Sequence, residues 1–427
     1  ATIALLTCSV TAWAQPALQT VSLEQLLARA ARHPEVMIAG ADIEIASGAV
    51  VAADRAPLPA VSASIGSVDL QNGIGPGSWV GGKRLDKALG VDWVWERGDK
   101  RLHRTRQAER SLDAAAFDRG DVLLARRIAI SAAFWDLLAA QDREVDSSIM
   151  LRSAEQMANA SRQRLEKGDI SEQEAARVFI ETERTRSDYT ALRGARHLAA
   201  VSLAQTAALA TDRIEAQAGW PELPAAIRLN QVQQSGQDSP YALMSARELD
   251  ELLNNRADVR AARSRLEAAR AALDLARALQ VPDITWGGGI NNYPPDQRAS
   301  VQLRAQFPWQ INYRFEGEIR QAVAGLQRAD EALRQTLLTA ESELSSLQFR
   351  RIAAAQRLDG FEKQILSRSQ QVLDRAEAAY ARGATSFTDL LDARRTFRAV
   401  RFDAIQARLE ATRADTEWRL RANLFTP

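Results

Sequence analysis

The chain has 427 residues, enough for several domains, and its 55 basic residues nearly balance its 54 acidic ones. The basic residues are spread next to acids and form no block interleaved with aromatics, so we expect no nucleic-acid partner. The three histidines lie far apart and the one cysteine is Cys8, so neither a zinc site nor a nucleophile–base pair can be assembled. We therefore expect no enzyme, no metal site and no cofactor.

Residues 1–14 are expected to be the remnant of a signal peptide. The segment carries no charge and ends in Ala12-Trp13-Ala14, which offers the small residues that a cleavage site needs. Cleavage after Ala14 would give an exported chain without cysteine. The alternative is lipidation of Cys8, but the preceding residues, Leu5-Leu6-Thr7, fit a lipoprotein signal poorly. Charges are expected to interrupt every later apolar stretch, so a membrane crossing would use β-strands.

The first half predicts a helix, a strand pair and a long helical hairpin. Residues 15–56 contain a helix that Pro57 and Pro59 end. In 57–99 two alternating apolar runs flank a glycine-rich loop, which indicates a β-hairpin. Residues 100–210 lack proline up to Glu166, which predicts a helix on the order of 100 Å, a turn at Gly168 and a second helix. The second helix starts with a capping box, Ser171 to Glu174, and residues 211–241 are a linker or equatorial segment.

The second half repeats the first. A shift of 223 residues superposes Val36 on Val259 and Pro59 on Pro282, and a shift of 215 places Gly168 on Gly383. The repeat predicts helices in 242–281 and 316–423, around a β-hairpin in 282–315. Its strands have about ten residues, the length of a tilted membrane strand, and carry tryptophans suited to the membrane surfaces. A coiled-coil seam is indicated by Leu326, Leu333, Leu337, Leu344 and Leu347.

Three segments resemble the TolC-like outer-membrane efflux family: Arg256-Ala257-Asp258-Val259, Tyr380-Ala381-Arg382-Gly383 and Asp389-Leu390-Leu391-Asp392-Ala393. The resemblance covers nearly the whole chain. Within the family, Trp95-Glu96-Arg97-Gly98 and Phe307-Pro308-Trp309 look most like the branch that exports heavy-metal cations.

The resemblance implies a mainly α fold with a small membrane β part. It implies a homotrimer in outer-membrane lipid, in which duplicated hairpins form an α-barrel in the periplasm and four strands per chain form a 12-stranded β-barrel. Its function would be the exit duct of a tripartite, proton-driven efflux system. The partners would be a periplasmic adaptor (a membrane fusion protein) and an inner-membrane pump of the resistance-nodulation-division class.

The resemblance also suggests functional residues. Asp389 and Asp392 match acids that line the periplasmic aperture, while Tyr380 and Glu174 match residues that help to hold it shut. Thr385 stands where the family has a basic partner, so Arg382 or Arg394 is expected to serve instead. The adaptor is expected to dock at the hairpin tips, which contain Leu165, Gly168, Asp169, Ser171, Gly383 and Ser386.

Two alternatives stay open on the sequence alone. The same duct could export drugs or proteins, because the pump selects the cargo. A periplasmic coiled-coil scaffold or adaptor would also suit the export signal, but it leaves the alternating strands and their aromatics unexplained.

Overall fold

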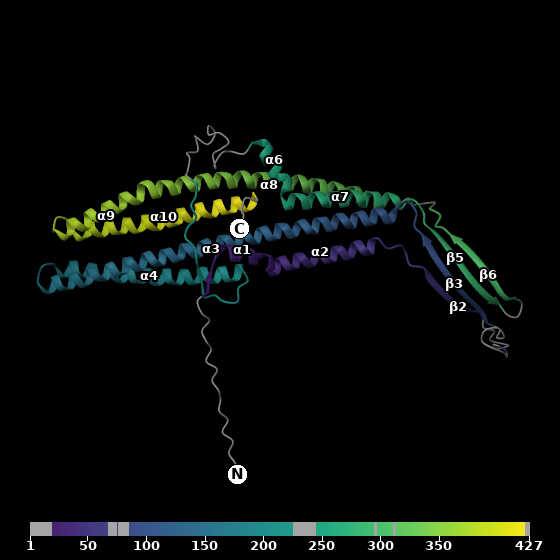
Figure 1. The fold of residues 1–427 in the computed structure, drawn as a ribbon, viewed down its shortest axis with the longest axis horizontal. Coiled ribbons are helices and arrows are strands. Elements are labelled where there is room, and N and C mark those ends of the chain that lie inside the picture. Colours follow the sequence, from purple (N-terminus) through teal and green to yellow (C-terminus); the bar gives the residue numbers. More distant parts are fainter. Residues whose placement is uncertain are drawn as a thin grey trace, which may run out of the picture. The chain divides into compact units, whose positions relative to one another are not determined.

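The structure is a computed structural model that describes residues 19–66, 75, 85–224, 245–293, 297–310 and 313–422. The expected signal peptide, Cys8, and most of the glycine-rich loop and of the linker lie outside these residues. The chain forms two compact units, each built from both repeats: residues 1–37, 122–252 and 341–427 form unit 1, and residues 38–121 and 253–340 form unit 2. The fold is mainly helical, as predicted (Figure 1).

The two predicted β-hairpins combine into one antiparallel sheet in unit 2 (Figure 1). The strands are β2 (Ala60–Gly66), β3 (Asp86–Trp95), β5 (Ile284–Tyr293) and β6 (Gln297–Gln306), in the order β2-β3-β5-β6. The hairpins join through β3 and β5, where Trp93 lies opposite Trp286. The sheet therefore links the two repeats edge to edge.

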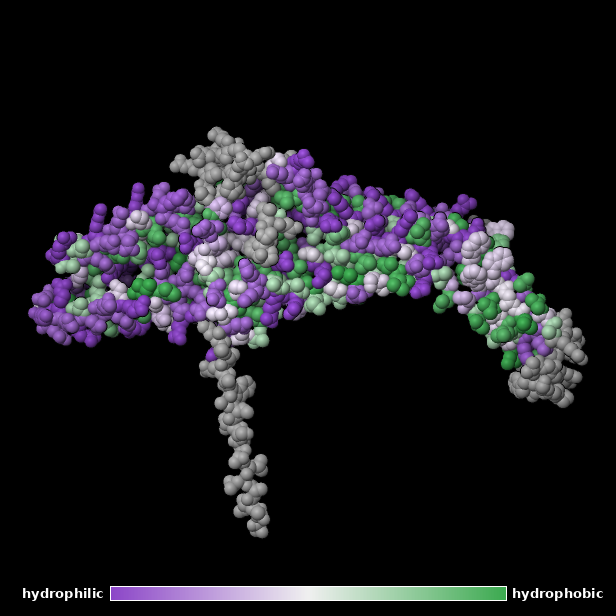
Figure 2. Space-filling view, viewed as in Figure 1, coloured by the Kyte–Doolittle hydropathy of each residue, from purple (hydrophilic) through white to green (hydrophobic). Residues whose placement is uncertain are grey.

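One face of this sheet is apolar and exposed. Alternation sends Trp93, Trp286 and Leu303 to the same face, where they are 59%, 51% and 85% exposed. Figure 2 shows hydrophobic side chains gathered over the strands. An apolar surface of this kind is typical of contact with lipid or with a partner.

A partly buried ion pair lies at the join between the sheet and the helices of unit 2. The Asp283 carboxylate accepts the Arg97 backbone N–H at 2.9 Å and the Lys100 ammonium at 2.7 Å. The Lys100 side chain is only 8% exposed. Lys100 is the first residue of α3, in the first repeat, and Asp283 directly precedes β5, in the second repeat. One carboxylate therefore connects the start of α3 to the start of β5.

The single helix expected within residues 15–56 is divided in two, which corrects the prediction. The segments are α1 (Leu23–Arg29), a 3-10 turn (Ala30–Arg32) and α2 (Pro34–Ala53). His33 is extended, with ψ 140°, because a residue before proline is excluded from the helical region. Pro34 takes the first turn of α2, where its missing N–H costs nothing.

The segment Leu23–Ala53 is long and apolar enough, by length and composition alone, to cross a membrane. The expectation that charges interrupt every later apolar stretch was therefore wrong. Within α2 the three acids, Glu35, Asp42 and Glu44, are too few to break up the alanines and valines. Met37 and Ile45 are 60% and 71% exposed, so α2 presents apolar side chains on its surface.

The long helices form two hairpins. In the first, α3 (Lys100–Glu166) is followed by α4 (Glu172–Thr206). In the second, α8 (Glu316–Gly360), a π-helical turn (Phe361–Ile365) and α9 (Leu366–Ala381) lead to α10 (Phe387–Arg421). The helical stretch from Glu316 to Ala381 is thus continuous, as expected, but it contains a π-helical turn that the sequence did not predict. Of the predicted seam, Leu344 and Leu347 are buried and Leu326, Leu333 and Leu337 are half-buried.

An extensive apolar core lies in unit 1. Phe134 and Leu137 of α3 are fully buried against Leu203 of α4 and Leu409 of α10. Part of the expected linker joins this core: β4 (Ile214–Ala216) pairs in parallel with β1 (Gln19–Val21). Unit 1 continues into α6 (Ala246–Asn255), and unit 2 contains α7 (Ala257–Ala278).

Candidate functional site: hairpin tips and aperture residues

The two hairpin tips have the same backbone geometry. Gly168 and Gly383 adopt φ of +79° and +71°, a region that costs glycine little. In each tip the glycine N–H donates to the backbone carbonyl of the residue three positions earlier. The N–H of the residue after the glycine donates to the carbonyl five positions before that residue. This pattern satisfies the last carbonyls of α3 and α9 as a Schellman cap does. The predicted turns therefore lie at both glycines, and Leu165, Asp169, Ser171 and Ser386 lie within these turns or flank them.

Tyr380 connects all four helices at the tips. Its hydroxyl donates to Glu174 of α4 at 3.1 Å, and its ring lies 5.9 Å from that of Phe387 on α10. The Arg164 guanidinium of α3 lies 5.9 Å from the centre of the same ring. Burial, then the hydrogen bond to Glu174, raises the pKa of Tyr380, so the phenol stays a donor at neutral pH. The structure therefore brings together the predicted pair of Tyr380 and Glu174.

The predicted basic partners do not join this cluster. Arg382 donates to the Ala378 carbonyl at 3.0 Å, and Arg394 pairs with Glu377 at 2.7 Å, both within the second hairpin. Arg164 takes the place beside Tyr380 instead. The sequence did not predict the role of Arg164, because the interaction joins two different hairpins. The available signal was that Arg164 directly precedes Leu165, the residue that aligns with Tyr380 in the repeat.

Asp389 and Asp392 are both exposed on the first turns of α10. The Asp389 carboxylate accepts the N–H and the hydroxyl of Ser386, at 3.2 and 2.8 Å, which completes a capping box. Asp389 thus has a structural role at the helix start. Glu174 holds the matching place in the first repeat, but its carboxylate turns to Tyr380.

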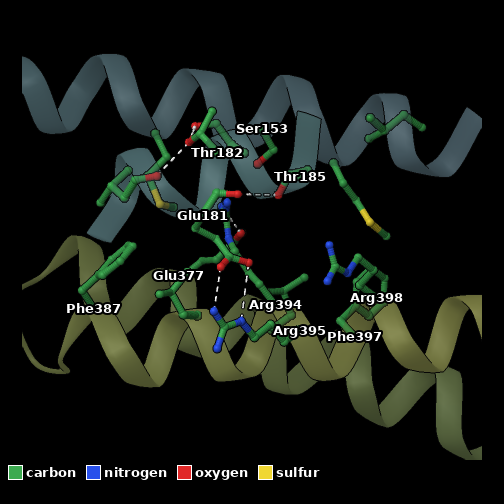
Figure 3. A pocket seen from close by; sticks show the side chains of 17 residues that line it. Ser153, Glu181, Thr182, Thr185, Glu377, Phe387, Arg394, Arg395, Phe397 and Arg398 are labelled. Atoms are coloured by element: carbon green, nitrogen blue, oxygen red, sulfur yellow. Dashed lines mark hydrogen bonds and ion pairs between the residues drawn. The ribbon is translucent and has the colours of Figure 1, made fainter. Parts of the chain in front are cut away.

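Ion pairs join the two hairpins along α10. Arg395 pairs with Glu181 at 2.6 Å, Arg398 with Asp188 at 2.8 Å, and Arg401 with Asp146 at 2.5 Å. Glu181 first, and Asp392 as a minor contributor, raise the pKa of Arg395. Figure 3 shows the Glu181 carboxylate directed from the first hairpin toward Arg395. These pairs hold the tips of one chain together.

A cavity of about 190 Å³ lies between the hairpins at the same level. Its lining is mainly apolar and includes Met150, Met157, Val178, Leu373, Phe387 and Phe397. Within the described residues, no three His, Cys, Asp or Glu side chains are placed to hold a metal ion. The tips thus combine positive-φ turns with an ion-paired hairpin interface.

Residues 249–422 match the sequence family described as "Outer membrane efflux protein". Two relatives align with most of the chain. The pyoverdine export outer membrane protein OpmQ of Pseudomonas aeruginosa is 23% identical over 72% of the chain and 63% of its own length. The cobalt-zinc-cadmium resistance protein CzcC of Cupriavidus metallidurans is 24% identical over 70% of the chain and 68% of its own length. The chain therefore spans about two thirds of each relative.

Solved structures share the fold over nearly the whole chain. CusC, described in terms of transmembrane channel formation, superposes with a TM-score of 0.76 at 17% identity, covering 94% of this chain and 91% of its own. VceC of Vibrio cholerae gives 0.73 at 19% identity, covering 94% and 95%. MtrE of Neisseria gonorrhoeae gives 0.72 at 18%, covering 94% and 88%. Residues 249–422 are thus similar to the outer membrane efflux protein family, and the repeated hairpins and the shared sheet give the whole chain the fold of these solved channel structures.

Proposed function

We propose that the chain is one third of an exit duct for efflux across the outer membrane. The observation that supports this proposal most strongly is the four-stranded sheet with one exposed apolar face. Membrane barrels need about eight strands or more, and an open edge in lipid leaves backbone groups unpaired. Three copies supply 12 strands and close the sheet.

The long hairpins of three copies would form the periplasmic part of the duct. The exposed apolar side chains of α2, such as Met37 and Ile45, favour this assembly because a neighbouring copy would remove them from water. The tips would then dock on a periplasmic adaptor, which connects the duct to an inner-membrane pump driven by protons. The glycine turns and the Tyr380 cluster are the surfaces we assign to docking and to closure.

We infer that the cargo is a divalent heavy-metal cation. Support comes from the relative CzcC, named for cobalt, zinc and cadmium resistance, and from the resemblance of Trp95-Glu96-Arg97-Gly98 to the metal-exporting branch. A strain that lacks this chain should accumulate zinc, cobalt or cadmium, and the restored gene should lower the metal content again. Normal metal content together with retention of an organic compound would reassign the duct to organic cargo.

The aperture supplies a test at the level of residues. Three copies of Asp389 and Asp392 would crowd carboxylates in one ring, which attracts cations and binds multivalent ones. Replacing both by Asn should lower cation preference in planar-bilayer recordings and weaken block by a trivalent cation, by about tenfold or more. Because Asp389 also caps α10, the single Asp392→Asn variant separates pore charge from helix capping. Unchanged selectivity and block in both variants would leave these acids as surface residues of the helix start.

A further inference from the structure

An ion pair crosses three strands on the polar face of the sheet. Asp92 of β3 and Arg304 of β6 both lie opposite Gly287 of β5. Their side chains meet across this middle strand, with Arg304 Nη2 2.5 Å from Asp92 Oδ1. Neighbouring strands lie about 4.8 Å apart, so each side chain reaches over the backbone of β5.

Gly287 leaves the space that this contact needs. A Cβ on Gly287 would lie under 3.0 Å from Asp92 Oδ1 and 3.2 Å from Arg304 Nε. A Cβ on the next residue, Gly288, points to the other face and meets only Leu303 Cδ2, at 3.9 Å. The requirement for glycine is thus specific to the position between the two charges.

The side chains that lie next to the ion pair on this face carry no charge. On the same face, a Cβ on Gly289 would lie 3.0 Å from the Leu89 carbonyl oxygen, and one on Gly90 would lie 3.0 Å from Ser62 Oγ. The neighbouring side chains of this face are uncharged, namely Ala60, Ser62, Val94, Thr285, Gln302 and Gln306. The Asp92 side chain is 23% exposed and that of Arg304 is 53% exposed, so the pair lies at the surface of the wall.

In the proposed duct, the polar face and the apolar face of the sheet have different surroundings. If the face with Trp93, Trp286 and Leu303 contacts lipid, the opposite face lines the lumen. Three copies would then place three Asp92 carboxylates at one level of the duct. Carboxylate oxygens are preferred ligands of hard divalent cations, and conduction requires that each site release the ion readily.

We propose that Asp92 and Arg304 form the charge-balancing element of the duct wall and thereby determine its ion selectivity. Arg304 keeps Asp92 from trapping divalent cations in transit. Asp92 in turn holds the Arg304 guanidinium against the wall across Gly287, so that no ring of positive charge extends into the lumen. This inference rests on the proposed duct function.

Bilayer recordings of four variants of the full chain test the proposal. Arg304→Gln should raise cation over anion permeability about twofold or more and make the current sensitive to millimolar Mg²⁺. Asp92→Asn should shift permeability toward anions by a similar factor. Gly287→Ala keeps both charged side chains but separates them, so the conductance should fall. Gly288→Ala is the matched control and should behave as the unchanged protein. The proposal is overturned if Asp92→Asn and Arg304→Gln leave selectivity unchanged, or if Gly287→Ala matches Gly288→Ala.

A second measurement separates this inference from the duct itself. Cysteine is introduced at Gln306 on the polar face or at Leu303 on the apolar face, in a chain whose one other cysteine is Cys8. A bulky, charged thiol reagent should reduce the current of Gln306→Cys and leave Leu303→Cys unaffected. If Gln306→Cys does not respond, both the lumen assignment and the inference fail. If it responds while the charge variants show no shift, the inference alone fails.

Discussion

Asp415→Ala should lower the free energy of unfolding by about 3–5 kcal/mol, because it leaves a buried guanidinium without its carboxylate. Arg351 Nε lies 2.7 Å from Asp415 Oδ1, and their side chains are 10% and 7% exposed. The pair joins α8 to α10 inside unit 1, beside Trp418. Denaturant unfolding in detergent, followed by tryptophan fluorescence, measures the loss.

Arg419→Ala provides the matched control for Asp415→Ala. Arg419 binds the other oxygen of the same carboxylate at 2.7 Å, but its side chain is 41% exposed. Exposed pairs contribute about 0–1 kcal/mol, so this variant should be nearly neutral. If the two variants destabilise the protein equally, burial does not determine the strength of this ion pair.

Valine at Gly168 or Gly383 should abolish adaptor docking while the sheet stays folded. Both glycines have φ near +75°, which costs an L-residue about 1–2 kcal/mol and a β-branched residue more. A Cβ meets nothing within 4 Å at either position, so the effect arises from the backbone of the turn and not from a clash. Pull-down of the adaptor should fall by about tenfold or more, the equivalent of about 1.4 kcal/mol.

Two further variants check the cause of that loss. Asn tolerates the left-handed region, so Gly383→Asn should keep most of the docking. Gly194→Val lies in α4 with open space around it and no positive φ, and it should dock normally. Val variants at both tips that still assemble a working pump would show that the adaptor binds elsewhere.

Sequence periodicity predicted the parts of the fold that depend on local pattern. Alternation along Val91, Trp93 and Trp95 gave the correct strand and the correct face, because the period of a strand is two. The absence of proline from Lys100 to Glu166 predicted the length of α3, and Gly168 predicted its end and its turn. Duplication carried both features into the second half.

Other features depend on interactions that no local pattern shows. The break at His33 was readable from Pro34, but the alanine-rich flanks favoured one continuous helix. The π turn at Phe361–Ile365 has no proline and follows Gly360, which has ordinary helical angles. Arg164 beside Tyr380 and Asp92 against Arg304 are contacts between distant segments, so their partners appear only in three dimensions.

The number of chains in the detergent-solubilised particle tests the proposed duct most directly. In the described residues, the sheet β2-β3-β5-β6 has four strands and an open edge on either side, and three chains would close it. Mass measurement of the purified protein in detergent should therefore give three copies. A stable monomer that stays in solution without detergent would contradict the proposed duct.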